Sequence, residues 1–184
     1  MIFEINSQER KLLLSLKNGI EEVNIYKSGI YPTVVIFRLV GGKKVTIRAR
    51  DEGIAPRFEV FPISVSEEEI NGEPDQVIGG LHFSGNCNIY ILQKSEWSIN
   101  SSEDEKEGLI GNPTGATTQY EGRSSEIPAH AINQATLHAG IKVEGKSGQS
   151  LIVATSMFPF ALYVTDCEFS ESVDENIYES EILC

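Results

Sequence analysis

The sequence predicts a mainly β (α+β) fold, in which hairpins build an antiparallel sheet or half-barrel with one or two short helices and a long central loop. Three observations carry this prediction. Short runs of apolar and β-branched residues alternate with polar ones, which is the spacing of half-buried strands. Turns that contain glycine separate many of these runs, as in hairpins. The clearest helical spacing of apolar residues lies near the N-terminus, in residues 7–17.

The predicted helix begins near Ser7 and ends near Asn18. Ser7-Gln8-Glu9-Arg10 resembles a capping box shifted by one position, and leucines follow at helical spacing. Asn18-Gly19 then supplies a stop signal, because glycine readily adopts the left-handed conformation that ends helices. We therefore expect residues 7–17 to form one short amphipathic helix.

The first half of the chain then reads as a meander of strands. Residues 33–40 are apolar and β-branched, and residues 44–50 alternate strictly after a glycine turn. The second run predicts a hairpin strand with a solvated basic face, made by Lys44, Thr46, Arg48 and Arg50. Residues 58–65 continue the meander, with Pro62 at an edge or a bulge.

The next segments predict further strands. Residues 66–75 are acidic and predict a loop or one helical turn, and residues 77–83 and 88–93 predict a strand pair. Later, residues 141–144 and 151–154 flank a glycine turn and predict another hairpin, followed by a strand at 160–164. Residues 127–131 lead into a possible second short helix. Trp97 is interpreted as a core residue that alternatively anchors an interface.

We expect one domain over residues 1–184, with residues 100–126 as a mobile loop and residues 170–184 as an acidic tail. The loop is long and polar, and such loops are usually functional or disordered. A chain of 184 residues buries enough surface to fold without disulfides or a metal. The three cysteines, Cys87, Cys167 and Cys184, are odd in number and widely spaced, which predicts reduced thiols in the cytoplasm. We find neither a secretory signal nor a membrane span.

Charge separates the two halves of the chain. The net charge is −12, with 27 acidic against 15 basic residues. Residues 1–100 hold 13 acids and 11 bases, whereas residues 101–184 hold 14 acids and 4 bases. Such a chain repels nucleic-acid phosphates and anionic membranes, so neither is an expected partner.

The sequence contains only weak candidates for catalytic motifs. His82, His130 and His138 have no carboxylate or thiol at zinc-ligand spacing, so we expect neither a metal site nor another cofactor. On a helix, His130 and His138 would lie two turns apart on one face, and Cys87 could serve as a nucleophile beside a histidine. Gly140-x4-Gly145-Lys146-Ser147 matches the phosphate-binding loop pattern, but the strand-like residues that follow it predict a hairpin turn instead.

Residues 140–162 resemble segments of known proteins. The stretches Gly140-Ile141-Lys142-Val143, Leu151-Ile152-Val153-Ala154 and Phe158-Pro159-Phe160-Ala161-Leu162 resemble small bacterial proteins that include immunity proteins of contact-dependent growth inhibition and related polymorphic toxin systems. This resemblance implies a cytoplasmic protein that binds and neutralises a cognate toxin, and many such toxins are basic. It transfers no functional residues.

Two functions from different classes follow. The leading hypothesis is a non-catalytic, acidic binding protein whose partner is a basic toxin domain. Its predicted partner-binding residues are Glu103, Asp104, Glu105, Glu107, Asp166, Glu168, Glu171, Asp174 and Glu175. The alternative is a small enzyme or small-molecule-binding domain that uses His130, His138 and Cys87 in a cleft.

Overall fold

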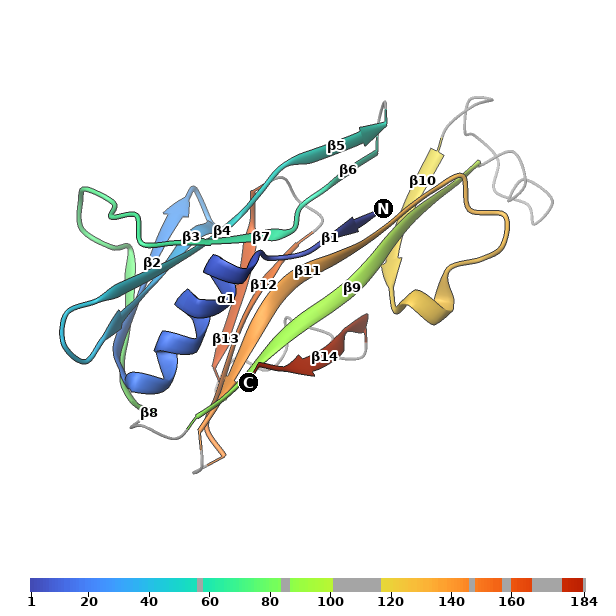
Figure 1. Ribbon diagram of the computed structural model, residues 1–184. Helices are drawn as coiled ribbons and strands as arrows, with labels where there is room; N and C mark the ends of the chain where they lie inside the picture. The colour runs from blue at the N-terminus through green and yellow to red at the C-terminus, as the bar shows by residue number, and fades with distance from the viewer. Residues whose placement is uncertain are drawn as a thin grey trace.

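The computed structural model of the protein describes residues 1–55, 58–83, 87–100, 117–145, 148–156, 160–166 and 177–183 (Figure 1). At residues 80–83, 100, 117 and 166 it describes the backbone of a strand and not the side chains. The elements, contacts and grooves given below all belong to these residues. None of the helices in these ranges is long and apolar enough to cross a membrane.

Two large sheets dominate the molecule. In the seven-stranded sheet the order is β10 (Thr117–Gly122), β9 (Asn88–Asn100), β11 (Asn133–Glu144), β12 (Ser150–Thr155) and β13 (Leu162–Asp166). Two further strands join it: β1 (Ile2–Phe3) pairs with β11, and β14 (Glu179–Ile182) pairs with β9. Except for the parallel β1–β11 pair, its pairings are antiparallel.

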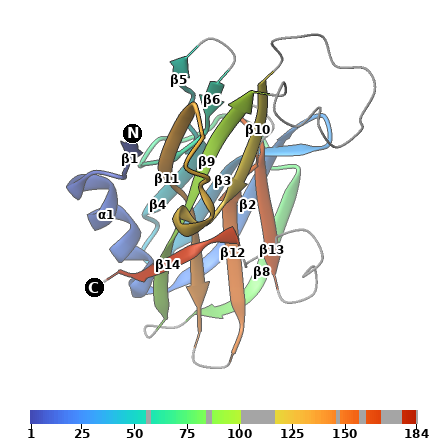
Figure 2. The same cartoon turned by 90° about the vertical axis from the view of Figure 1, so that its right-hand side faces the viewer.

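The second large sheet has five antiparallel strands. Its order is β7 (Ile63–Ser66), β4 (Lys44–Ala49), β3 (Tyr31–Leu39), β2 (Ile20–Ser28) and β8 (Gln76–Phe83). A small pair, β5 (Glu52–Ala55) and β6 (Phe58–Val60), projects from it (Figures 1 and 2). The structure thus confirms a mainly β fold with a curled, antiparallel half-barrel and a single short α-helix.

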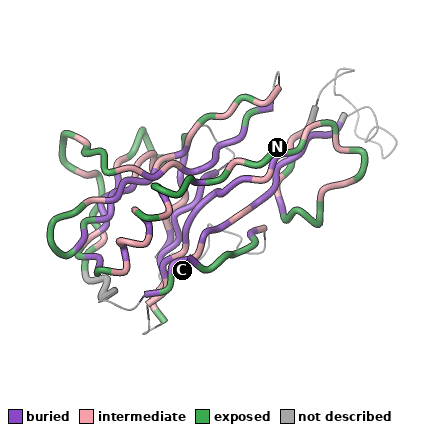
Figure 3. Tube along the Cα trace, viewed as in Figure 1, coloured by how far each residue is buried: buried purple, intermediate pink, exposed green. Residues whose placement is uncertain are grey.

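One shared core joins the two large sheets. The side chains of Val35, Phe37, Val45 and Ile47 from the five-stranded sheet pack in one cluster with Ile141, Val143, Leu151 and Val153 from the seven-stranded sheet. Figure 3 shows the buried residues gathered along the strands that face each other. The spacing of these residues explains this arrangement, because alternate side chains of a strand point to the same face of its sheet.

Helix α1 (Ser7–Leu14) and the 3-10 helix η1 (Ser15–Asn18) match the predicted span of 7–17. The helix begins at Ser7 as predicted, and its N-cap is Asn6. The Asn6 side chain accepts hydrogen bonds from the backbone N–H groups of Gln8 and Glu9, and the Glu9 carboxylate accepts one from Asn6 N–H. Gly19 ends the segment with a φ of 107°, as its type predicts.

The predicted basic face of β4 is real, but it is not freely solvated. Thr46 is fully buried and donates a hydrogen bond to the Glu68 carbonyl at 2.6 Å. Lys44 pairs with Glu69 at 2.7 Å, and Arg48 pairs with Glu68 at 3.3 Å. The prediction was wrong about solvation because the acidic residues after β7 fold back over this face.

Residues 77–83 and 88–93 do not form the predicted strand pair. Strand β8 pairs with β2 in the five-stranded sheet, whereas β9 pairs with β10, β11 and β14 in the other sheet. The alternation of apolar residues identifies a strand but not its partner, and that limit produced the error.

Two segments predicted to be irregular contain strands. The end of the predicted mobile loop contains β10 at residues 117–122 and the 3-10 helix η3 (Ser124–Glu126). Residues 127–131 were predicted to lead into a second short helix, but they lead into strand β11 instead. The predicted acidic tail contains β14, with Tyr178 and Leu183 buried on either side of it. Both strands lie at edges, where polar side chains are tolerated: the side chains of β14 are exposed, and most of those described on β10 are half-buried. Residues 101–116 lie outside the described residues.

Candidate functional site

The predicted acidic binding residues are not placed by the described structure. The backbone of Asp166 ends β13 opposite Leu151, while its side chain is outside the description. The remaining eight lie in segments that the structure does not describe: Glu103, Asp104, Glu105, Glu107, Glu168, Glu171, Asp174 and Glu175. Their role therefore stays a prediction.

The histidines and Cys87 do not converge. His130 is exposed in a turn, whereas His138 is buried on β11 opposite Gln93, so the expected helical spacing is wrong. Cys87 lies six positions before Gln93 along the same chain, which corresponds to about 20 Å of extended strand. The two grooves described below are lined by other residues. No cleft shared by His130, His138 and Cys87 is present among the described residues.

His138 and Cys87 have structural surroundings. The Nδ1 atom of His138 accepts a hydrogen bond from Ile5 N–H at 3.2 Å. Burial lowers the pKa of His138, which keeps the ring neutral and able to accept. The Cys87 thiol lies 3.8 Å from the Leu16 carbonyl, and burial raises its pKa, so the reactive thiolate is disfavoured.

Strands β11 and β12, which flank the Gly-Lys-Ser motif, form a hairpin, as predicted, while Lys146 and Ser147 lie outside the described residues. Strand β12 follows the motif and pairs antiparallel with β11, and Gly145 N–H donates to the Gln149 carbonyl at 2.8 Å. Gly140 has a packing role. A Cβ atom at this position would lie 2.4 Å from the Val153 carbonyl oxygen, so the close approach of β12 requires glycine.

A buried charged cluster occupies the middle of β9. The Lys94 side chain is 0% exposed, and its Nζ atom lies 3.0 Å from Glu96 Oε1 and 2.5 Å from Glu121 Oε2. The Gln119 amide donates to Glu96 Oε2 at 2.7 Å and to the Glu59 carbonyl at 3.0 Å. Glu96 and Glu121 are direct cross-strand partners on β9 and β10. Two like charges face each other here, and the lysine between them offsets their repulsion.

The electrostatics of this cluster favour the charged lysine. Burial alone would lower the pKa of Lys94, but the attraction of Glu96 and Glu121 outweighs burial and raises it above the ordinary value. Burial raises the pKa of the nearby Tyr178 hydroxyl to about 12, so this residue stays protonated. The cluster thus holds one positive and two negative groups, and only Glu121 reaches solvent, with 26% of its side chain exposed.

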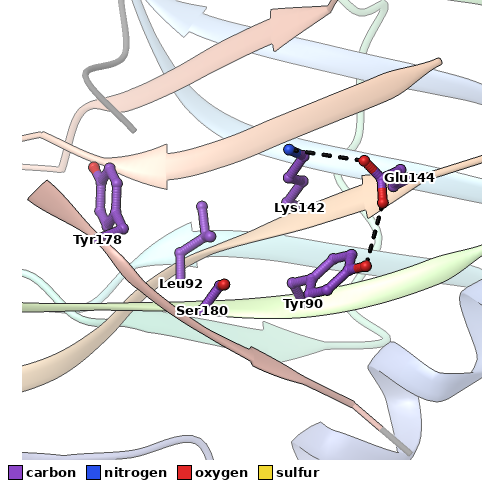
Figure 4. A pocket seen from close by; sticks show the side chains of 6 residues that line it. All are labelled: Tyr90, Leu92, Lys142, Glu144, Tyr178 and Ser180. Carbon is purple, nitrogen blue, oxygen red and sulfur yellow. Dashed lines mark hydrogen bonds and ion pairs between the residues drawn. The ribbon is translucent and has the colours of Figure 1, made fainter. Parts of the chain in front are cut away.

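A small groove lies on the same sheet (Figure 4), and one of its residues, Tyr178, interacts electrostatically with Lys94 of the cluster. It encloses about 200 Å³, and its floor comes from β9, β11 and β14. Tyr90 and Tyr178 stand at its two ends, and Tyr90 donates to Glu144 at 3.2 Å. Its complete lining is Tyr90, Leu92, Lys142, Glu144, Tyr178 and Ser180. The register explains this grouping, because Tyr90 faces Lys142 and Ile182, and Leu92 faces Ser180.

A second depression at the start of α1 is shallow. It is lined by Asn6, Gln8, Glu9, Leu12, Val65, Ser66 and Glu67. The Glu9 carboxylate already accepts from the backbone N–H groups of Asn6 and Val65, at 2.7 and 3.0 Å. The groups that would bind an anion at this helix end are therefore occupied from within the chain.

Most basic side chains in the described residues are engaged in ion pairs. The ion-paired basic residues are Arg10, Arg38, Lys43, Lys44, Arg48, Arg50, Lys94 and Lys142. Their acidic partners lie close in space, so no uncompensated basic surface forms around them. Within the described ranges, no group of three or more His, Cys, Asp and Glu side chains is placed to hold a metal ion.

A comparison of the chain with protein-family models, with curated proteins and with solved structures found no match. The function therefore has to be argued from the site itself.

Sequence reasoning missed the Lys94 cluster, although a signal was present. Strand β9 extends to Asn100, beyond the predicted 88–93, and Lys94 and Glu96 occupy alternate positions among its apolar residues. Charged residues on a buried strand are rare unless they are paired. Such an interruption therefore predicts a partner of opposite charge, but only the pairing of β9 with β10 identifies Glu121.

Proposed function

We propose that the chain is a non-catalytic, acidic binding protein that captures and neutralises a basic protein partner, in the manner of an immunity protein acting on a toxin domain in the cytoplasm. One observation carries the proposal. Most basic side chains of the described residues form internal ion pairs, while the whole chain holds 27 acidic and 15 basic residues. The excess of twelve negative charges (27 − 15) is left to act on a partner.

Such an excess produces a long-range negative field. A field of one sign accelerates the encounter with an oppositely charged protein and repels nucleic acid. The sequence concentrates the excess in residues 101–184. The predicted contact residues are those of the two acidic runs, residues 103–107 and 166–175.

Co-expression with a neighbouring gene product tests this function. The C-terminal domain encoded immediately upstream would be expressed in a heterologous bacterium, with and without this chain. The proposal expects growth arrest by that domain alone, and rescue together with co-purification when this chain is present. Rescue without a complex would point to another mechanism, and a harmless upstream domain that does not bind would remove this proposal.

The groove between Tyr90 and Tyr178 favours a second candidate function, the binding of a small ligand. Two aromatic side chains and the Lys142–Glu144 pair offer both stacking and polar contacts. Its volume of about 200 Å³ is below the roughly 300–1,000 Å³ of most ligand pockets, so this function ranks second. A thermal-shift screen of metabolites would support it if the stabilising compounds lose their effect on the groove-filling variant Ser180→Trp.

A further inference from the structure

The Lys94 cluster brings together three groups with complementary chemistry. Lys94 supplies an amine, Glu121 supplies a carboxyl carbon on the neighbouring strand, and Glu96 supplies a second carboxylate within reach of the same nitrogen. Lys94 Nζ lies 2.5 Å from one oxygen of Glu121. The carboxyl carbon is one bond further, which is close to the separation of about 3–3.5 Å at which bound groups react.

The surroundings distinguish this arrangement from a surface ion pair. The side chains of Lys94 and Glu96 are 0% and 1% exposed, and both sit on a strand that is hydrogen-bonded on both sides. A buried ion pair keeps a desolvation cost that its mutual attraction only partly offsets. Converting Lys94 and Glu121 into an amide removes one positive and one negative charge from the cluster and leaves Glu96 as its only charged group.

We propose that Lys94 and Glu121 condense into an intramolecular amide bond that joins β9 to β10, with Glu96 as the group that moves the proton.

The step balances in atoms and charge. The Lys94 ammonium gives one proton to Glu96, and its freed electron pair forms a bond to the carboxyl carbon of Glu121. The carbon–oxygen bond of Glu121 breaks, and this oxygen leaves as water with two protons that originate from the ammonium, one of them delivered by Glu96. Glu96 ends as the carboxylate it was at the start. The net charge of the cluster is −1 before and after the reaction, and no oxidant or other reactant is required.

The roles of the two carboxylates follow from their positions. Glu96 is held on its other oxygen by the Gln119 amide at 2.7 Å, which fixes it as a proton carrier. Glu121 has the shorter contact with the amine and is the partly exposed one, so water can leave from it. Because the pKa of Lys94 is raised, its neutral amine form is rare and the reaction is slow. The bond has to form only once in each folded chain, so a slow reaction is sufficient.

The amide bond would link the edge strand β10 covalently to β9. Among the described residues β10 pairs with β9 alone, and residues 101–116 separate the two strands in the chain. A covalent bond between residues 94 and 121 closes a loop that spans 27 positions (121 − 94) and restricts the unfolded chain, as a disulfide does. The inference is independent of the proposed function, since a cross-linked chain could bind any partner.

The mass of the intact purified protein tests the proposal. After denaturation, the wild-type chain should be lighter than its sequence mass by one water, about 18 Da. Proteolysis should release a branched peptide that links the segments around residues 94 and 121. A wild-type mass equal to the sequence mass after prolonged incubation of the folded protein would overturn the proposal.

Two variants separate this bond from other losses of water. Lys94→Arg keeps the positive charge but has no amine that can condense in this way, so it should have the full sequence mass. Glu96→Gln keeps Lys94 and Glu121 but cannot carry the proton, so the cross-linked fraction should fall at least tenfold. Loss of water that persists in Lys94→Arg would overturn the assignment. The wild-type measurement decides the matter alone if either variant fails to fold.

Discussion

His138 shows how a single buried side chain couples this fold to pH. Its Nδ1 atom accepts from Ile5 N–H, which only an unprotonated nitrogen can do. Burial lowers the pKa of His138 in the folded protein, so below about pH 6.5 the unfolded chain binds a proton more readily. The contribution of His138 to stability is therefore present above that pH and is lost as the pH falls.

We expect His138→Asn to reduce the acid sensitivity of the protein, because an amide oxygen can accept from Ile5 N–H without titrating. The free energy of unfolding would be measured by urea denaturation between about pH 7.5 and 5. Wild type should lose more stability over this range than the variant. His130→Asn is the matched control, because His130 is exposed, and it should follow wild type. Equal slopes for all three proteins would contradict this role of His138.

Glu121 and Gly140 show which contacts could not be predicted from the sequence. The sequence marks Lys94 and Glu96 as charges within an apolar strand, yet it cannot supply Glu121, which lies 25 positions beyond Glu96 (121 − 96). Likewise, the sequence correctly predicted a hairpin turn after Gly140, but only the approach of Val153 explains the glycine itself. Contacts between distant segments depend on strand pairing, which local patterns do not encode.

At the scale of elements, α1 depends on its N-terminal cap. Asn6 accepts from two backbone N–H groups that would otherwise be unpaired. We expect Asn6→Ala to lower the free energy of unfolding by about 0.5–2 kcal/mol. Urea denaturation checks this value, with the exposed neighbour Gln8→Ala as a control that should change it little. A neutral Asn6→Ala would mean that the packing of Leu13 and Leu16 alone holds the helix.

Strand β14 was not predicted, because the acidic composition of residues 170–184 indicated a tail. Leu183 is 3% exposed and its N–H donates to the Ile89 carbonyl at 2.8 Å, whereas the adjacent Ile182 is 50% exposed. We expect Leu183→Ala to destabilise the protein by about 2–5 kcal/mol, and Ile182→Ala by no more than about 0.5 kcal/mol. Thermal and urea unfolding of the two variants measure the difference. Similar small effects would show that this segment behaves as the acidic tail that its composition suggests.

At the scale of the whole molecule, the fold class was predictable because alternation is repeated in many segments. One face of each of the runs 33–40, 44–50, 141–144 and 151–154 places its apolar residues in a shared core, whereas Ile152 and Ala154 pack in a second cluster. The division into two sheets was not predictable, because residues 77–83 and 88–93 have the same strand pattern but separate partners. The placement of the acidic runs that carry the proposed function lies outside the described residues.

Charge is the property of the whole molecule on which the proposed function depends. The Debye length falls from about 10 Å in 0.1 M salt to about 3 Å in 1 M salt, so an attraction based on net charge weakens over this range. Contacts between apolar groups would not weaken in this way. The salt dependence of binding therefore separates the two kinds of recognition.

The most direct test of the central claim is the Kd for the domain encoded upstream, measured at about 0.1 and 1 M salt. Wild type should bind at least about tenfold more weakly at high salt, mainly through slower association. A chain with both acidic runs reversed to lysine should bind weakly at both concentrations. The reversed residues would be Glu103, Asp104, Glu105, Glu107, Asp166, Glu168, Glu171, Asp174 and Glu175. A Kd that is the same at both salt concentrations, or that survives this charge reversal, would contradict the account.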